Sequence, residues 1–287
     1  MNTCNGYYLI DHEDEWEDVE MRSRYREKYY VCGDYMELSL YPVYKTARQR
    51  RRKAKPTAEC QKKVNQMHAE NKCIRLAHAN FTAADMKADL TYDGKHLPVD
   101  DESAARELAN FFRRVKRYRK RQGLSELKYI AVTEKGKRTG RYHHHLIISG
   151  GLSPQEIIML WGKGYVRTDG LQFNENGISD LVKYILKRSV ASCKRWNQSK
   201  NLIHPEPKQR DGRLSKRAVQ ELARDTENSR EYERYYPDYC LAEARRVYSD
   251  VTGGIYIYAR FYRKEAEFCR EKKRSRSHCS SGQSLQR

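Results

Sequence analysis

The chain has 287 residues, of which 38% are hydrophobic and 33% are charged, and its formal net charge is +19 at pH 7. That length permits one large domain or two small ones. A surface so basic attracts polyanions, and nucleic acid is the expected partner. The sequence contains no long apolar run of the kind that spans a membrane or forms a signal peptide, so we expect a cytoplasmic protein with no membrane partner.

The eight cysteines are scattered singly along the chain. No pair of them has a C-x2-C or C-x4-C spacing. This distribution disfavours both a zinc finger and a compact disulfide scaffold. We therefore expect reduced thiols.

The N-terminal part is acidic, then rich in tyrosine, and then basic. The first twenty residues contain acidic side chains and no Lys or Arg. The alternating stretch Met36–Tyr44 predicts one strand. Residues 45–63 form a basic run, which is usually a solvated arm and which we expect to touch DNA phosphates without reading sequence. This run includes Arg50, Arg51 and Arg52.

The next stretch predicts a helix, a strand and a second helix. Helical spacing covers Lys62–Ala79, and apolar alternation predicts a strand over Asp85–Asp93. Asp100–Ser103 offers N-cap residues for a helix with an apolar stripe, which we interpret as core. Basic residues surround that stripe and are expected to follow a nucleic-acid backbone, among them Arg113, Arg114, Arg117 and Arg119. The stripe itself consists of Leu108, Phe111, Phe112, Val115 and Tyr118.

The stretch Lys128–Ile148 predicts two strands around a polar turn that contains Gly136 and Gly140. Because side chains alternate along a strand, His143 and His145 share one face while His144 points to the other. The two imidazoles could reach one metal ion, and Glu134 could add a carboxylate if the strands pair as a hairpin. A His-His-carboxylate set leaves positions open for a phosphate oxygen, which suits metal-assisted phosphoryl chemistry. A chance cluster of histidines on an exposed strand is the alternative.

Several more elements follow. Ser153–Glu156 is a capping box with proline at the first helical position, and that helix should stop at Gly162 or Gly164. Short strands are predicted at Tyr165–Arg167 and Leu171–Phe173, and a helix runs from Ser179 or Asp180 to about Arg188. The pattern predicts an α+β fold in which helices pack on an antiparallel sheet.

Tyr184 and Lys187 lie three residues apart on this last predicted helix, so they are neighbours on its surface. The apolar residues of this helix can face the core, which leaves Tyr184 and Lys187 toward the opposite or flanking face; they are Ile178, Leu181, Val182 and Ile185. A phenol is a poor nucleophile unless its phenolate is stabilised, as a metal ion or an ammonium group would do. Since the chain has 22 tyrosines, an ordinary surface pair is the simpler interpretation of these two residues alone.

Beyond residue 193 the pattern weakens. A helix is predicted over Ser215–Asp225 and a final strand over Gly254–Tyr262. Residues 263–287 are basic and rich in serine, and we expect them to be disordered. No G-x4-G-K-[ST] stretch occurs, so the sequence predicts no P-loop helicase of its own.

Taken together, three stretches resemble the motifs of HUH endonucleases. GRYHHHLII resembles the family's His-hydrophobe-His motif with His144 in the middle, ADLTY (Ala88–Tyr92) resembles the first motif, and YILK (Tyr184–Lys187) resembles the motif with the catalytic tyrosine. Their order is that of rolling-circle replication initiators, with the closest likeness to those of small bacterial phages and plasmids. The resemblance covers about residues 81–187 and extends more loosely to residue 262.

The resemblance implies a site and a reaction. His143, His145 and Glu134 would bind Mg²⁺ or Mn²⁺, and Tyr184 would attack the scissile phosphate of single-stranded DNA at a replication origin. A 5′-phosphotyrosine would form, with Lys187 orienting the phosphate or stabilising the phenolate. Thr91 and Tyr92 would shape the site. The middle residue of the motif is a histidine and not an aliphatic residue. An alternative alignment of the motif, in which His144 is one of its two histidines, therefore stays open.

The resemblance also implies the wider organisation of the chain. The fold would be an HUH/RRM-like palm with basic terminal extensions, acting in a bacterial host cell with a host helicase. Two other functions stay open: a mobilisation relaxase or single-strand transposase, and a non-catalytic DNA-binding regulator of replication with structural histidines. The expected divisions are an acidic, Tyr-rich segment with a basic arm at 1–80, a catalytic domain at 81–192, an accessory region at 193–262 and a tail at 263–287.

Overall fold

A computed structural model describes six stretches of the chain. Arg50, Arg51, Arg52 and the acidic N-terminal residues lie outside these stretches, as do Arg188 and most of the expected tail. The described residues are 23–44, 58–136, 139–174, 176–187, 195–249 and 254–265.

The chain forms two compact units, which we describe separately. One unit contains residues 72–204, and the other combines residues 1–71 with residues 205–287. The first of these units encloses the whole segment expected to be catalytic. The second joins strands from both ends of the chain in one sheet, an arrangement that no local sequence pattern indicated.

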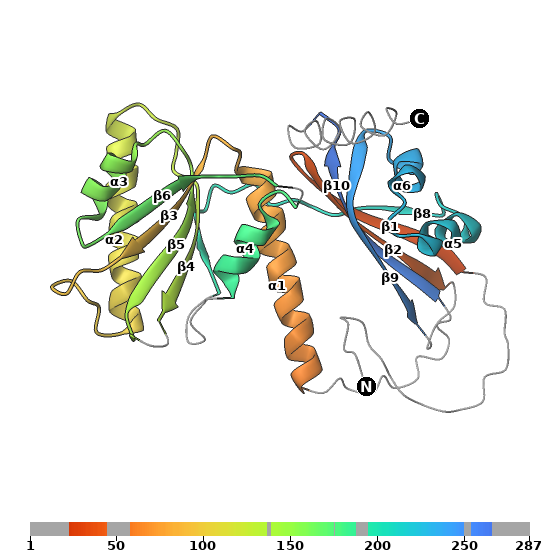
Figure 1. Cartoon of the computed structure of the whole chain (residues 1–287), viewed down its shortest axis with the longest axis horizontal. Helices are drawn as coiled ribbons and strands as arrows, with labels where there is room; N and C mark the ends of the chain where they lie inside the picture. Colours follow the sequence, from red (N-terminus) through yellow and green to blue (C-terminus); the bar gives the residue numbers. More distant parts are fainter. Residues whose placement is uncertain are drawn as a thin grey trace, which may run out of the picture. The chain divides into compact units, whose positions relative to one another are not determined.

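The unit of residues 72–204 is built on a five-stranded antiparallel sheet (Figure 1). The strand order is β6-β3-β5-β4-β7, so β5 lies at the centre with β3 and β4 beside it. The β4–β5 pair is the hairpin that the sequence predicts. The strands are β3 (Met86–Thr91), β4 (Tyr129–Lys135), β5 (Tyr142–Ile148), β6 (Val166–Gly170) and β7 (Asn197–Gln198).

Two helices cover one face of this sheet. The helix α2 (Asp101–Arg121) begins with a capping box at Asp100, and α3 (Pro154–Trp161) begins with the predicted capping box at Ser153. The helix α3 ends at Gly162, whose φ of 62° favours glycine. The predicted stripe of α2 packs into the core beneath it, formed by Leu108, Phe111, Phe112 and Val115, with Tyr118 partly buried against them.

The helix α4 (Ser179–Leu186) lies on the other side of the sheet from α2 and α3 (Figure 1). Its buried residues include Val182 and Ile185, and Ile178 just before it is also buried, as predicted. Leu181, which was predicted to face the core with them, is only partly buried. A hydrogen bond of 3.2 Å between His78 Nε2 and Ser179 Oγ joins the start of α4 to the last turns of α1 (Ala58–Asn80). This contact and the buried residues hold α4 in place.

The other unit has its own five-stranded antiparallel sheet, in the order β8-β1-β2-β10-β9. Two helices cover one face, and residues such as Leu38, Leu222 and Phe261 form the core between them. The strands are β1 (Ser23–Cys32), β2 (Tyr35–Tyr44), β8 (Lys208–Asp211), β9 (Tyr239–Ser249) and β10 (Gly254–Arg263), and the helices are α5 (Lys216–Arg224) and α6 (Ser229–Tyr235).

The α+β class is confirmed, but some predicted elements are wrong. Leu171–Phe173 is not a strand. The backbone NH of Leu171 bonds to the carbonyl of Asp85, 3.0 Å away, and a turn closed by Asn174 and Gly177 follows. The strands β1 and β9 were not predicted, because tyrosine and charged residues fill most of their positions instead of an apolar alternation.

Two further observations concern membranes and thiols. Within the part of the chain that the structure describes, no helix has the length and apolar character needed to cross a bilayer. Cys32, Cys73 and Cys240 are free thiols, as expected.

The close approach at Gly150 gives a test of this fold. A Cβ atom at Gly150 would overlap the backbone oxygen of Ala84, whereas one at Gly170 would meet nothing within 4 Å. We expect Gly150→Ala to lower the free energy of unfolding by about 1–3 kcal/mol because the backbone must shift. Gly170→Ala is the matched control. Urea unfolding followed by the fluorescence of buried Trp161 measures both, and equal stabilities of the two variants would contradict the packing described.

Candidate functional site

The register of the β4–β5 hairpin places the predicted residues on one face of the sheet. Glu134 is paired with His143, and on the other side of β5 Thr91 is paired with His143 and Asp89 with His145. His143 and His145 therefore share the face that carries Glu134, Thr91 and Asp89. The predicted hairpin and the predicted division of faces are both confirmed.

His144 points into the core on the opposite face and is fully buried. Its Nε2 is 2.8 Å from the hydroxyl of Tyr92, and its Nδ1 is 3.0 Å from the hydroxyl of Thr133. Burial, together with nearby His145 and His143, lowers the pKa of His144 to about 3, so the ring is neutral. With both ring nitrogens occupied, His144 cannot serve as a ligand on the open face, and the alignment of the motif that uses His144 is wrong.

His145 lies between two carboxylates. Its Nδ1 donates to Asp89 Oδ1 over 2.6 Å, and its Nε2 donates to Glu134 Oε2 over 2.8 Å. Burial disfavours a charged ring, but the hydrogen bonds with Asp89 and Glu134 outweigh that effect and raise the pKa of His145. The imidazole is thus held in one orientation by both of its nitrogens.

Lys87 extends this chain of alternating charges. Its Nζ is 2.9 Å from Asp89 Oδ2. Burial would raise the pKa of Asp89, but the hydrogen bonds from His145 and Lys87 outweigh burial and lower it. Lys87, Asp89, His145 and Glu134 therefore form a continuous line of opposite charges across β3, β5 and β4.

The ring of Tyr184 lies against this line. Its centroid is 6.4 Å from that of His145, with an angle of 72° between the ring planes. Lys87 Nζ is 5.9 Å from the centre of the Tyr184 ring. Tyr184 is 45% exposed, so a ligand from solvent can reach it. The helix α4 thereby brings the predicted tyrosine to the predicted histidine face of the sheet.

His143 is oriented toward the turn of the hairpin. Its Nε2 is 3.8 Å from the position that a Cβ of Gly136 would take. The structure brings His145 and Glu134 together but does not converge all three predicted ligands. Among the described residues, no group of three or more His, Cys, Asp and Glu side chains is arranged to hold a metal ion.

Two of the predicted ligands, His145 and Glu134, offer an imidazole nitrogen and a carboxylate oxygen, which are ligand types that a divalent cation accepts. His145 Nε2 and Glu134 Oε2 are 2.8 Å apart, and adjacent donors around an octahedral Mg²⁺ of about 2.1 Å bond length lie about 3 Å apart. A cation there would replace the proton that the two atoms share. His143 lies on the same face of the sheet, one row nearer the turn.

Three other predicted residues have different surroundings. The Thr91 hydroxyl donates to the carbonyl of Tyr165 over 2.9 Å, on the site face. Tyr92 is buried on the core face, where it supports His144 rather than facing the site. Lys187 is the exposed C-cap residue of α4, and in the described part of the chain its side chain has no ion-pair partner.

The basic residues of α2 divide into two groups. Arg114 bonds the carbonyl oxygens of Leu160 and Trp161 at 2.8 and 3.1 Å, and so caps the end of α3. Arg119 is 2% exposed, so the expectation that it follows a nucleic-acid backbone is wrong. Its guanidinium bonds the carbonyls of Ser125 and Gly150 instead. Arg113 and Arg117 lie on the outer face of the helix, where DNA can reach them.

Sequence reasoning overlooked Lys87 and Asp89. The alternation of β3 already placed both on the same face as Thr91, opposite the apolar Ala88 and Leu90. What was missing was the pairing of β3 with β5, which no local pattern fixes. A pair of opposite charges on the same face of the strand as Thr91 was the available signal.

Residues 88–189 match the sequence model of a family described as replication-associated protein, of the ORF2 type. This segment contains Asp89, Glu134, His143, His145 and Tyr184, and the match is consistent with a replication initiator. No curated protein and no solved structure shows a significant match to the chain.

The neutral state of His144 generates a pH prediction. In the unfolded chain a histidine titrates near about 6.5, whereas folded His144 stays neutral down to about 3. Below about pH 6.5 the unfolded state therefore binds a proton that the folded state does not. The free energy of unfolding consequently decreases as the pH is lowered. From about pH 7.5 to about pH 5 this costs about 2 kcal/mol.

The variant His144→Gln lacks this titration. We expect the difference in unfolding free energy between the wild type and His144→Gln to narrow by about 2 kcal/mol over the same pH interval. Urea unfolding at the two pH values measures it. A difference that is constant with pH would mean that the pKa of His144 is the same in the folded and the unfolded chain, which would contradict its burial as a neutral ring.

Proposed function

We propose that the protein is a replication initiator that nicks single-stranded DNA through a covalent bond to Tyr184. The observation that carries the proposal is the placement of the Tyr184 ring against His145, on the face that also holds His143 and Glu134. The matched family model supports a role in replication. The geometry supports the chemistry, because a nucleophile and a set of phosphate-binding groups share one exposed site.

In the proposed reaction, Tyr184 is the nucleophile. The phenol of Tyr184 gives its proton to solvent, and its oxygen attacks the scissile phosphorus. A bond forms between that oxygen and phosphorus, while the bond from phosphorus to the 3′ oxygen breaks. The leaving 3′ oxygen takes a proton from solvent, so a 5′-phosphotyrosine and a free 3′-hydroxyl result. Attack by a 3′-hydroxyl on the phosphotyrosine reverses the step and rejoins strands.

Lys87 and Lys187 supply positive charge near this reaction. The ammonium group of Lys87 lies 5.9 Å from the centre of the Tyr184 ring and places a positive charge beside the proposed nucleophile. Lys187 follows Tyr184 by three residues and can reach the phosphate from the end of α4. Asp89 positions His145 and pairs with Lys87, so we assign it a positioning role.

We assign His145, Glu134 and, after a change of rotamer, His143 to a Mg²⁺ or Mn²⁺ ion. When bound, this ion supplies charge stabilisation at the phosphate oxygens. Asp89 holds the Nδ1 of His145, which leaves Nε2 as the donor to the ion. Thr91 fixes the neighbouring chain through the carbonyl of Tyr165.

The substrate we propose is single-stranded DNA at a replication origin, bound mainly by the basic surface, with Arg113 and Arg117 among the contacts. The basic run with Arg50, Arg51 and Arg52 lies outside the described residues and keeps its proposed phosphate-binding role. A host helicase would separate the strands. A relaxase or single-strand transposase would use the same site on a different DNA, and a non-catalytic regulator would bind DNA without the covalent step.

The covalent step can be tested directly with a pool of random single-stranded oligonucleotides labelled at the 3′ end. With Mn²⁺, the wild type should retain label through a denaturing gel, because the 3′ fragment stays bonded to the protein. Tyr184→Phe should abolish the labelled band. Tyr165→Phe, which alters a 71% exposed tyrosine of the same unit, should leave it within about twofold.

Two outcomes would contradict the proposal. A band of equal strength in Tyr184→Phe would place the nucleophile elsewhere. DNA binding by the wild type without any band, in Mg²⁺ or in Mn²⁺, would favour the non-catalytic regulator.

The roles of the histidines predict a separation of binding from nicking. His143→Ala and His145→Ala should each lower the rate of adduct formation by at least about 100-fold. Their affinity for DNA should stay within about twofold, since affinity comes mainly from Lys and Arg. His96→Ala changes an exposed histidine of the same unit and is the control. Loss of DNA binding in the first two variants, at unchanged stability, would show that the histidines have another role.

A further inference from the structure

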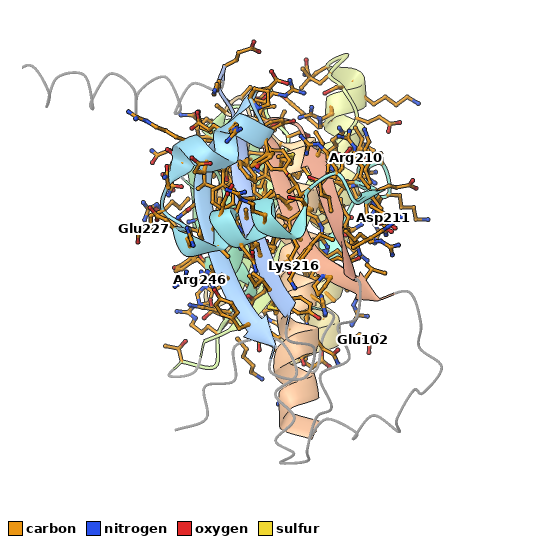
Figure 2. The ribbon with its side chains drawn as sticks, turned by 90° about the vertical axis from the view of Figure 1, so that its right-hand side faces the viewer. Glu102, Arg210, Asp211, Lys216, Glu227 and Arg246 are labelled. Carbon is orange, nitrogen blue, oxygen red and sulfur yellow. The ribbon has the colours of Figure 1, made fainter. Side chains whose placement is uncertain are left out.

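A second candidate site lies in the other unit, where residues from 27–36 and from 208–263 line it. A cavity of about 390 Å³ opens beside β1 and β8, next to the turn that follows α6. Its volume falls within the range of sites that hold small organic ligands, roughly 300–1,000 Å³. Figure 2 shows Arg210 and Asp211 on β8, at the edge of the sheet opposite to Arg246 on β9.

A buried carboxylate lines this cavity. Glu27 is 1% exposed, and its Oε1 accepts hydrogen bonds from Arg213, at 2.8 Å, and from the hydroxyl of Tyr236. Its Oε2 is also buried but has no hydrogen-bond partner among the described residues. An unpaired buried acceptor is costly, so this oxygen is suited to receive a donor from a ligand.

Aromatic rings and guanidinium groups line the rest of the cavity in pairs. Arg210 lies 5.2 Å from the ring centre of Tyr29, and Arg213 lies 5.1 Å from that of Tyr236. The strand register pairs Arg210 with Glu27, so both face the cavity. Such pairs offer a flat surface for a base and a cation for a phosphate.

The balance of charge narrows the class of ligand. Four cationic side chains line the cavity, against the two carboxylates of Glu27 and Asp238. A cationic ligand would meet repulsion, whereas a simple anion could not donate to Glu27 Oε2. A nucleotide satisfies both conditions, because it joins an anionic phosphate to a base with N–H donors. The four cationic side chains are Lys208, Arg210, Arg213 and Arg263.

We propose that this cavity binds one unpaired nucleotide of single-stranded DNA, with its base between the tyrosines and its exocyclic amino group on Glu27 Oε2. The proposal takes DNA as the ligand from the proposed function, but it does not depend on the covalent step at Tyr184. An amino group is present on adenine, cytosine and guanine. Thymine instead has two carbonyls beside its single N–H, which a carboxylate repels.

The cavity would thereby contribute to the recognition of DNA sequence. The basic surface of the protein binds any DNA strand, whereas the Glu27 oxygen distinguishes thymine from the three bases that carry an amino group, at a single position. This division assigns part of the recognition of a DNA site to the unit that lacks Tyr184. It also gives a role to β1 and β8, whose charged and tyrosine side chains lack the apolar alternation that predicts a strand.

The experiment measures DNA affinity by fluorescence anisotropy, with the full chain carrying Tyr184→Phe so that no cleavage occurs. The probes are oligo(dC) and oligo(dT) of about twelve nucleotides, at constant salt and about pH 8. We expect oligo(dC) to bind at least about fivefold more tightly than oligo(dT). Glu27→Gln, which preserves the shape of the side chain, should remove that preference.

Three further variants separate the roles of the cavity. Tyr29→Leu and Arg210→Gln should each weaken binding of oligo(dC) by at least about fivefold, through lost stacking and a lost phosphate contact. Arg217→Ala is the control, since Arg217 has an 88% exposed side chain on α5 and does not line the cavity. Arg217→Ala should keep the base preference and most of the affinity. Thermal unfolding of each variant establishes that it is folded.

Equal affinities for oligo(dC) and oligo(dT) of the protein that carries only Tyr184→Phe would overturn the proposal. A base preference that survives both Glu27→Gln and Arg210→Gln would overturn it as well. The mononucleotide dCMP tests whether the ligand is a free nucleotide instead of a nucleotide within a DNA strand. If dCMP binds as tightly as oligo(dC), the cavity is a site for free nucleotides and the proposal is wrong. Failure of the adduct experiment on Tyr184 would leave all these results unaffected, so the two proposals fail separately.

Discussion

The arrangement depends on one imidazole held between two carboxylates. His145 bonds Asp89 through one nitrogen and Glu134 through the other, and these three residues come from three adjacent strands. Because both nitrogens are engaged, the ring cannot rotate without breaking a charged hydrogen bond. Its fixed edge then serves as the surface against which the Tyr184 ring packs. A site that requires a phenol near a phosphate-binding group benefits from this rigidity.

The alternation of side chains on β5 gives each of the three consecutive histidines a different role. His144 enters the core and stays neutral, whereas His145 lies on the site face and keeps its proton between two acids. His143 is on the site face too, but beside the turn, with its ring near Gly136. The pKa values of two adjacent histidines therefore move in opposite directions, and burial and hydrogen bonding account for the difference. The assignment of His143 and His145 to a cation is a proposal that rests on this division.

The sequence alone predicted much of the unit of residues 72–204. Its hairpin, the capping box at Ser153, the N-cap at Asp100, the apolar stripe and the Tyr184 helix all depend on local spacing, which a sequence displays directly. The partners of His145 were only half predicted, since Glu134 is on the same hairpin while Asp89 comes from a strand 56 residues away. Arg119 was misjudged because its burial depends on carbonyl groups of distant loops. The sheet that joins both ends of the chain was missed, because tyrosine and arginine replace the apolar alternation that marks a strand.

We propose that Tyr184 becomes bonded to DNA at the histidine face of the sheet. The most direct test is to incubate the wild-type protein with single-stranded DNA and Mn²⁺, digest the DNA and the protein, and identify the modified peptide by mass spectrometry. We expect a nucleotide phosphate on Tyr184 and on no other tyrosine. A nucleotide on a different residue, or DNA binding with no modified peptide, would contradict it.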